Sequence, residues 1–194
     1  MCSNFEAAIA SRLLQETYAP SVIPKTTTPK TNIRPTDEVL IIKPGNQAEL
    51  MTWGFQTTWS TQPLINARAE TLFEKPTYRT SLENRCLVPA SAWFEWRKHH
   101  NQKFKNRISI EGQNMFAMAA IWQNDRFCIL TQQADAQIEQ VHHRMPVIIS
   151  SDKQEYWLDT SVQTKDILCG DQLTLTARFD LDEERPKHEQ FDLF

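Results

Sequence analysis

The chain has 194 residues, a formal net charge of −3 and 40% hydrophobic residues, which is enough apolar material for one domain with a buried core. A weakly acidic protein has no global field that draws it to nucleic acid, so any DNA contact has to come from a local basic patch. The sequence contains no run of about 18 apolar residues and no recognisable signal peptide, so we expect a cytoplasmic protein without membrane contact.

The first half of the chain predicts one helix followed by short strands. Residues 4–16 carry apolar side chains at helical spacing and predict an amphipathic helix. A stretch rich in proline and threonine at 19–36 predicts an extended loop. Strands are expected at 37–43, at 49–59 (as strand or loop) and at 64–70, the last leading into a short helix at 71–75.

The second half is dominated by strands. The run RCLVPASAWFEWRK at 85–98 alternates strongly and places Trp93, Glu95 and Arg97 on one face. Further strands are expected at 106–110, 115–123, 126–132, 144–150 and 171–179, and helices at 134–143 and 151–160. This order predicts a single strand-rich α+β domain over residues 1–194, with a core at 2–178 and a loosely held acidic tail at 179–194.

The positions of the cysteines argue against a metal site and suggest a reactive aminothiol at Cys2. The four cysteines, Cys2, Cys86, Cys128 and Cys169, are scattered and form no CxxC pair, so we expect reduced thiols and neither a metal nor another cofactor. Removal of Met1 would leave Cys2 with a free α-amine of pKa about 8 beside its thiol. Such an aminothiol traps aldehydes as a thiazolidine, although an idle thiol is the commoner case for a cysteine taken alone.

The motif NARAET at 66–71 places Asn66 and Arg68 on one face of a strand. An amide can hydrogen-bond an amine or a thiolate, and an arginine can hold a phosphate with two donors. The alternative is an exposed polar strand face on which Arg68 pairs with Glu70. Residue types alone do not separate the two interpretations.

Glu95 and His142 are candidates for proton transfer. Glu95 lies between Trp93 and Trp96, and desolvation by aromatic rings raises the pKa of a carboxyl group. The alternative is an outward-facing glutamate paired with Arg97 or Lys98. His142 belongs to a histidine pair where a predicted helix ends, a position that suits either a reactive group or a simple cap.

A basic strip at 97–107, RKHHNQKFKNR, holds five Lys or Arg residues and no acidic one. Arg68, Arg79 and Arg85 add further positive charge. Interleaved with aromatic residues, this pattern suits single-stranded nucleic acid, and it equally fits a solvated hairpin.

Taken in order, these motifs resemble the SRAP (SOS response-associated peptidase-like) family from residue 2 to about residue 157. The shared elements are Cys2 followed by Phe5, NIRPT, WGF with a later TW, NARAET, RCLVPASAWFEW and HHRMPVII. The resemblance implies a twisted, barrel-like mixed sheet with peripheral helices and a basic cleft. It further implies a protein that acts in the DNA damage and SOS response, binds abasic sites in single-stranded DNA and is nucleoid-associated when bound. Its N-terminal cysteine would form a thiazolidine with the ring-opened sugar. Nothing in the sequence suggests more than a monomer.

The resemblance assigns a role to each site residue. Cys2 corresponds to the nucleophile, Asn66 to the residue that orients it, Glu95 to the acid/base and His142 to the proton donor for the opening sugar. The predicted DNA contacts are Arg68, Arg144, Trp53, Arg79 and Arg85. The family usually reads Cys-Gly-Arg-Phe at its start, whereas this chain has Ser3 and Asn4, so a DNA-contacting arginine is missing.

Two other functions fit parts of the pattern. A cysteine peptidase would use Cys2 with His142 as its base, and removal of Met1 could be its own proteolysis, but no motif marks an oxyanion hole. A non-catalytic single-strand binder would need the basic strip and no Glu95. Strand cleavage by β-elimination would be a further activity of the crosslinking enzyme, because a Schiff base acidifies the neighbouring C–H bond.

Overall fold

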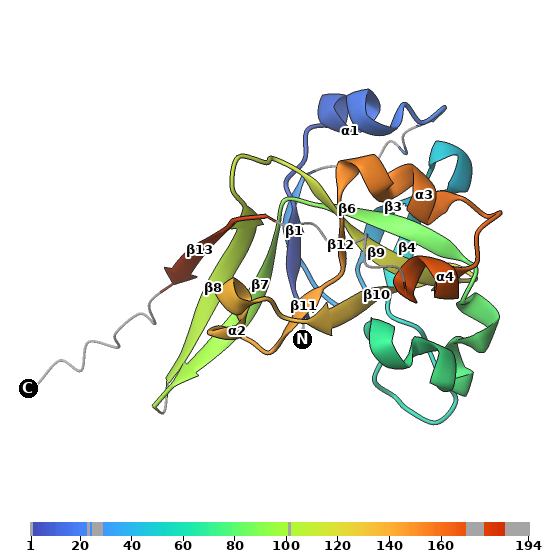
Figure 1. The fold of residues 1–194 in the computed structure, drawn as a ribbon. Coiled ribbons are helices and arrows are strands. Elements are labelled where there is room, and N and C mark those ends of the chain that lie inside the picture. Colours follow the sequence, from blue (N-terminus) through green and yellow to red (C-terminus); the bar gives the residue numbers. More distant parts are fainter. Residues whose placement is uncertain (1, 23, 25–28, 101, 170–176, 185–194) are drawn as a thin grey trace, which may run out of the picture.

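The computed structural model describes residues 2–22, 24, 29–100, 102–169 and 177–184. Its strands form two sheets, one of five strands in the order β13-β8-β7-β1-β2 and one of eight strands (Figure 1). In the larger sheet, β10 pairs with both β4 and β9, and the ring β3-β4-β10-β9-β6 is closed. The structure therefore confirms a strand-rich α+β domain with a barrel-like sheet.

The five-stranded sheet consists of β1 (Phe5–Ala7), β2 (Lys30–Ile33), β7 (Ala92–His99), β8 (Gln102–Ile110) and β13 (Phe179–Glu184). The eight-stranded sheet consists of β3 (Glu38–Lys43), β4 (Gln47–Trp53), β5 (Asn66–Arg68), β6 (Arg85–Ala90), β9 (Phe116–Gln123), β10 (Arg126–Gln133), β11 (Arg144–Pro146) and β12 (Ile148–Ile149). The helices are α1 (Ser11–Tyr18), α2 (Ala136–Glu139), α3 (Gln154–Leu158) and α4 (Thr164–Cys169). Among the described residues, no helix is long and apolar enough to cross a membrane.

Buried side chains form two clusters on the two sides of the larger sheet. Along β6, Cys86 and Val88 belong to one cluster, whereas Leu87 belongs to the other. Because alternate side chains of a strand point to opposite faces, β6 is buried along its whole length and reads as an unbroken apolar run. The first cluster fills the space between the two sheets, and it contains Cys2.

The amino end differs from the prediction, because a strand precedes the helix. Phe5 pairs with Ile33 of β2 and Trp93 of β7, and it is fully buried. Its apolar side chain is therefore used in the sheet, and helix α1 begins only at Ser11. The predicted helix at 4–16 is wrong in its first half, since sheet pairing with distant residues overrides local periodicity.

Two other boundaries need correction. The predicted strand at 85–98 is interrupted at Ser91, so β6 and β7 belong to different sheets. The acidic tail is not loosely held from residue 179, because β13 pairs with β8 along its entire length. Residues 170–176, where most of the last predicted strand lies, and residues 185–194 fall outside the described part of the chain.

Candidate active site

Cys2 lies at the amino end of β1, with none of its surface exposed. The Nδ2 of Asn66 donates a hydrogen bond to the Cys2 carbonyl oxygen at 2.6 Å, and the Cys2 thiol contacts the carbonyl oxygen of Asn4 at 3.8 Å. Burial raises the pKa of the thiol far above its ordinary range, and the charge of Glu95 adds to this effect. The thiol is therefore protonated at neutral pH.

Asn66 is held in place by the strand that carries it. It opens β5, which runs parallel to β10 with Asn66 opposite Ile129, and the Tyr78 hydroxyl donates to its main-chain oxygen at 3.3 Å. Its side-chain Oδ1 is buried, and no partner for it exists within the described residues. The amide thus places one donor on Cys2 and keeps an acceptor available nearby.

Glu95 lies in β7 and is only 2% exposed, on the same strand face as Trp93. Burial raises the pKa of this carboxyl group to about 7. This agrees with the predicted effect of aromatic desolvation. Arg97, the alternative partner considered from the sequence, is instead bound to Glu183.

His142 follows α2 and is partly buried. Its Nδ1 faces the backbone of Arg144, 3.0 Å from the N–H, from which a neutral Nδ1 accepts, and 3.2 Å from the carbonyl oxygen, to which a protonated Nδ1 donates. Burial lowers the pKa of His142, and the charge of Arg144 acts in the same direction. The side chains of Ile138 and Met145, on either side of His142 in sequence, belong to the same buried cluster as Cys2.

Arg144 has a different position from that expected of a DNA contact. Only 10% of its side chain is exposed, and it binds the Glu70 carboxylate with both terminal nitrogens at 2.6 and 2.9 Å. It also donates to the Thr131 carbonyl oxygen at 2.7 Å. Arg144 thus ties NARAET to the strand that follows His142, and its contact with DNA phosphate stays a prediction.

Arg85 and Trp53 are likewise inside the protein. The Arg85 side chain is 1% exposed and donates to the main-chain oxygens of Trp157, Asp159 and Val162. Trp53 is fully buried, stacks on Phe127 and donates from its indole N–H to a main-chain oxygen. Both were predicted to contact DNA, and their burial with satisfied donors argues against that role.

A groove of about 400 Å³, lined by both apolar and polar side chains, opens beside Asn66. Arg68 and Lys75 supply positive charge to it, and Trp59 lies at its edge with 67% of its surface exposed. Arg79, four residues after Lys75 in the sequence, is also exposed. Trp59 was not selected from the sequence, although it is the second tryptophan of WGFQTTW. An exposed tryptophan is unusual enough to mark a binding surface.

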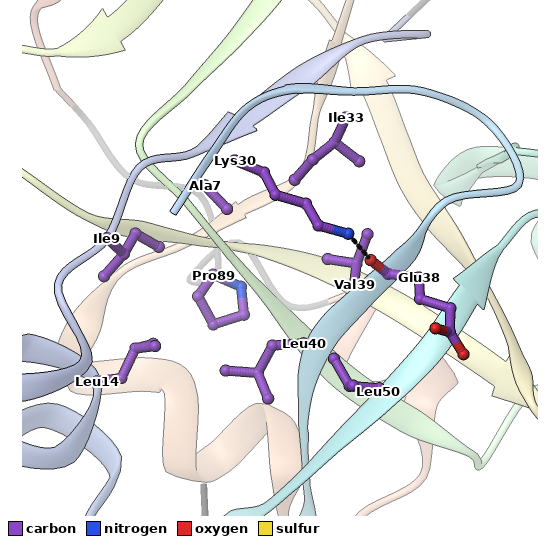
Figure 2. Close-up of a pocket in the computed structure, with 10 residues that line it drawn as sticks. All are labelled: Ala7, Ile9, Leu14, Lys30, Ile33, Glu38, Val39, Leu40, Leu50 and Pro89. Atoms are coloured by element: carbon purple, nitrogen blue, oxygen red, sulfur yellow. Dashed lines mark hydrogen bonds between the residues drawn. The ribbon is translucent and has the colours of Figure 1, made fainter. Parts of the chain in front are cut away.

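A second pocket lies between α1, β2 and β3 and is lined mainly by apolar side chains (Figure 2). It is small, about 50 Å³, and the Nζ of Lys30 donates to the main-chain oxygen of Glu38 at 2.8 Å. None of the predicted site residues lines it. In the described part of the chain, no group of three or more His, Cys, Asp or Glu side chains is arranged to hold a metal ion.

The fold and this site define a class of protein: a strand-rich α+β domain whose second residue is a buried cysteine beside an amide and a carboxyl group of raised pKa. A sequence model of the SOS response associated peptidase (SRAP) family matches residues 1–179, and the chain belongs to this family. It is 32% identical over 159 residues to the abasic site processing protein YoqW of Bacillus subtilis, covering 72% of this chain and 71% of that protein.

Two further comparisons are one of sequence and one of structure. The abasic site processing protein YedK of Escherichia coli is 28% identical over 149 residues, covering 70% of this chain and 67% of that protein. A crystal structure of a protein from Bordetella bronchiseptica superposes with a TM-score of 0.79 at 18% identity, covering 95% of this chain and 100% of that one. This structural likeness shows the shared fold.

Proposed function

We propose that this protein processes abasic sites in single-stranded DNA by linking Cys2 covalently to the ring-opened sugar. The observation that carries the proposal is the setting of Cys2, whose carbonyl group is held by Asn66 and whose thiol is influenced by the charge of Glu95. The similarity to YoqW and YedK, both abasic site processing proteins, supports the choice of substrate.

The reaction begins with the amine of Cys2. Met1 lies outside the described residues, and its removal is required to turn the Cys2 amide nitrogen into a primary amine. An α-amine has a pKa of about 8, so a useful fraction is neutral at pH 7 and can attack the sugar aldehyde. Water leaves and a Schiff base forms. The Oδ1 of Asn66 can accept an N–H of this amine and so orient its lone pair.

His142 assists the opening of the sugar. An abasic sugar is mainly a closed hemiacetal, and opening needs a proton on the ring oxygen. Because Nδ1 is engaged with the Arg144 backbone, Nε2 of the imidazolium is the nitrogen that would donate this proton. The lowered pKa of His142 makes its protonated form a stronger acid.

Glu95 assists the closure of the thiazolidine. The sulfur adds to the carbon of the Schiff base, the thiol loses its proton and the nitrogen gains one. Since the thiol is protonated at neutral pH, a base is needed, and a carboxyl group with a pKa of about 7 can take up and return a proton. Water is the only by-product of the whole sequence.

The same setting disfavours the peptidase alternative. A cysteine peptidase needs a thiolate, usually stabilised by an imidazolium, whereas burial keeps the Cys2 thiol protonated and the pKa of His142 is lowered. Cleavage of the DNA strand by β-elimination is expected as a side reaction, since it needs only the Schiff base.

The groove beside Asn66 is the proposed DNA-binding surface. Trp59 is placed to stack on a base, and Arg68 and Arg79 are exposed cations that can hold backbone phosphates. Binding of a single strand here would bring its sugar to Cys2 and would place the protein on DNA in the cell. We expect a single copy of the chain to suffice.

The test is a denaturing gel. Protein lacking Met1 is mixed with single-stranded DNA that contains one abasic site, and a matched strand without the site serves as control. We expect a heat-stable shifted band for the wild type with abasic DNA only, and no such band for Cys2→Ala. Absence of the band in the wild type, or its persistence in Cys2→Ala, would contradict the proposal.

A further inference from the structure

The basic hairpin of β7 and β8 is bordered by an acidic strand. Strand β13 pairs with β8 along its whole length at the edge of the smaller sheet (Figure 1). Three ion pairs connect the hairpin to β13, with N···O distances of 2.6, 3.6 and 4.0 Å: Arg97 with Glu183, Lys105 with Glu184, and Arg107 with Asp182. The basic strip noted in the sequence is therefore partly neutralised by the chain itself.

One of these pairs lies on the face of the sheet that carries Glu95. Asn106 is directly opposite Glu95 on one side and Glu183 on the other, and directly opposite residues of antiparallel strands point to the same face. Arg97 is two residues beyond Glu95, about 7 Å further along the same face. Glu184, opposite Lys105, points to the other face.

The Arg97–Glu183 pair is well formed and accessible to solvent. The Nε and one terminal nitrogen of Arg97 each donate to a different carboxylate oxygen at 2.9 Å, and the guanidinium carbon lies 5.2 Å from the centre of the Phe104 ring. The two side chains are 32% and 30% exposed. An ion pair with this exposure is weak, and phosphate accepts the same two-donor geometry as carboxylate. Replacing the Glu183 carboxylate by a DNA phosphate as the partner of Arg97 therefore costs little free energy.

The side chains at the amino end of the site supply no cation. Asn4 is buried and its Nδ2 donates to the Oδ1 of Asn32 at 2.6 Å, and residues 2–10 contain no Lys or Arg. We propose that Arg97 binds a backbone phosphate of the DNA beside the reacting sugar, and that Glu183 occupies Arg97 in the DNA-free protein as an internal competitor. This rests on the proposed function for the identity of the ligand, single-stranded DNA.

The proposal predicts whether each substitution raises or lowers the affinity for single-stranded DNA. Removing the charge of Glu183 frees Arg97, so Glu183→Gln tightens binding of single-stranded DNA by about two- to fivefold. Glu184→Gln is the matched control, since it removes the same charge from the neighbouring residue on the other face, and it changes binding less than twofold. Arg97→Gln weakens binding and lowers the salt slope by about 0.7, and it abolishes the gain from Glu183→Gln.

The experiment measures fluorescence anisotropy of a short, undamaged single-stranded DNA over a salt series, with thermal melts to confirm folding. Equal effects of Glu183→Gln and Glu184→Gln, an unchanged salt slope in Arg97→Gln, or a full Glu183→Gln gain in the double variant would each overturn the proposal. Arg97→Lys, which keeps the charge and loses the two-donor geometry, should fall between the wild type and Arg97→Gln. Undamaged DNA cannot crosslink, so failure of the adduct assay would refute the proposed function and leave this result standing.

Discussion

The raised pKa of Glu95 makes the stability of this protein depend on pH in an unusual direction. A carboxyl group whose pKa is higher in the folded than in the unfolded state binds its proton more tightly in the folded state. As the pH rises above the ordinary value of 4.5, the unfolded chain releases this proton first, so the free energy of unfolding falls. Above a pH of about 7, Glu95 is ionised in both the folded and the unfolded state, and the free energy of unfolding falls no further on its account.

The magnitude follows from the two pKa values. The difference between 4.5 and about 7, at 1.36 kcal/mol per pKa unit, corresponds to a loss of about 3 kcal/mol between these limits. Glu95→Gln cannot ionise, so it should be more stable than the wild type by about this amount at pH 8, relative to their difference at pH 4. The buried position of Glu95 means that solvent screens little of this effect.

Urea unfolding at a series of pH values, followed by tryptophan fluorescence, measures this difference. Glu111→Gln, the same change at an exposed glutamate on the turn after β8, is the matched control. Parallel stability profiles for the wild type and Glu95→Gln from pH 4 to pH 8 would refute the reasoning, because they would mean that Glu95 is solvated like an ordinary glutamate.

Four further outcomes are expected. Glu95→Gln should slow closure of the adduct by about 10²-fold or more, measured as the rate of the heat-stable band, because the thiol loses its base. Trp59→Ala should weaken single-strand binding by about 1–3 kcal/mol in anisotropy, without a change in Tm, if the indole stacks on a base. Arg85→Met should lower the free energy of urea unfolding by about 3 kcal/mol with little change in the DNA affinity of the folded protein. Glu70→Gln should destabilise the protein at neutral pH, and the difference from the wild type should vanish in acid, as the pH falls through the lowered pKa of Glu70.

Local sequence patterns predict the strands, whereas only the family resemblance predicts the contact between Cys2 and Asn66. Alternation along 92–98 reports on one strand alone, and it places Glu95 on the face of Trp93 without knowledge of any partner. The Asn66–Cys2 contact joins residues 64 positions apart and came only from the family resemblance. The first strand was missed because Phe5 finds its partners at Ile33 and Trp93, which local periodicity cannot reveal.

The burial of two predicted DNA contacts, Arg85 and Trp53, could not be read from the sequence. Arginine is charged and polar in any composition count, yet Arg85 is buried because several carbonyl oxygens, brought together by the turn after α3, accept from its guanidinium group. Trp53 and Trp59 are only six residues apart, and nothing in the sequence says that one fills the core and the other faces solvent. The acidic strand β13 was unrecognised because its charges are balanced by β8, a partner about 75 residues earlier in the chain.

The central claim is that both the amine and the thiol of Cys2 react with the abasic sugar. The most direct measurement is the mass of the nuclease- and protease-trimmed adduct, with its position assigned by peptide fragmentation. The account predicts a modification on the peptide that begins at Cys2, equal to the sugar fragment minus one water, and a Cys2→Ser adduct that survives denaturation only after borohydride reduction. A modification on any other residue, or a stable adduct on protein that retains Met1, would contradict it.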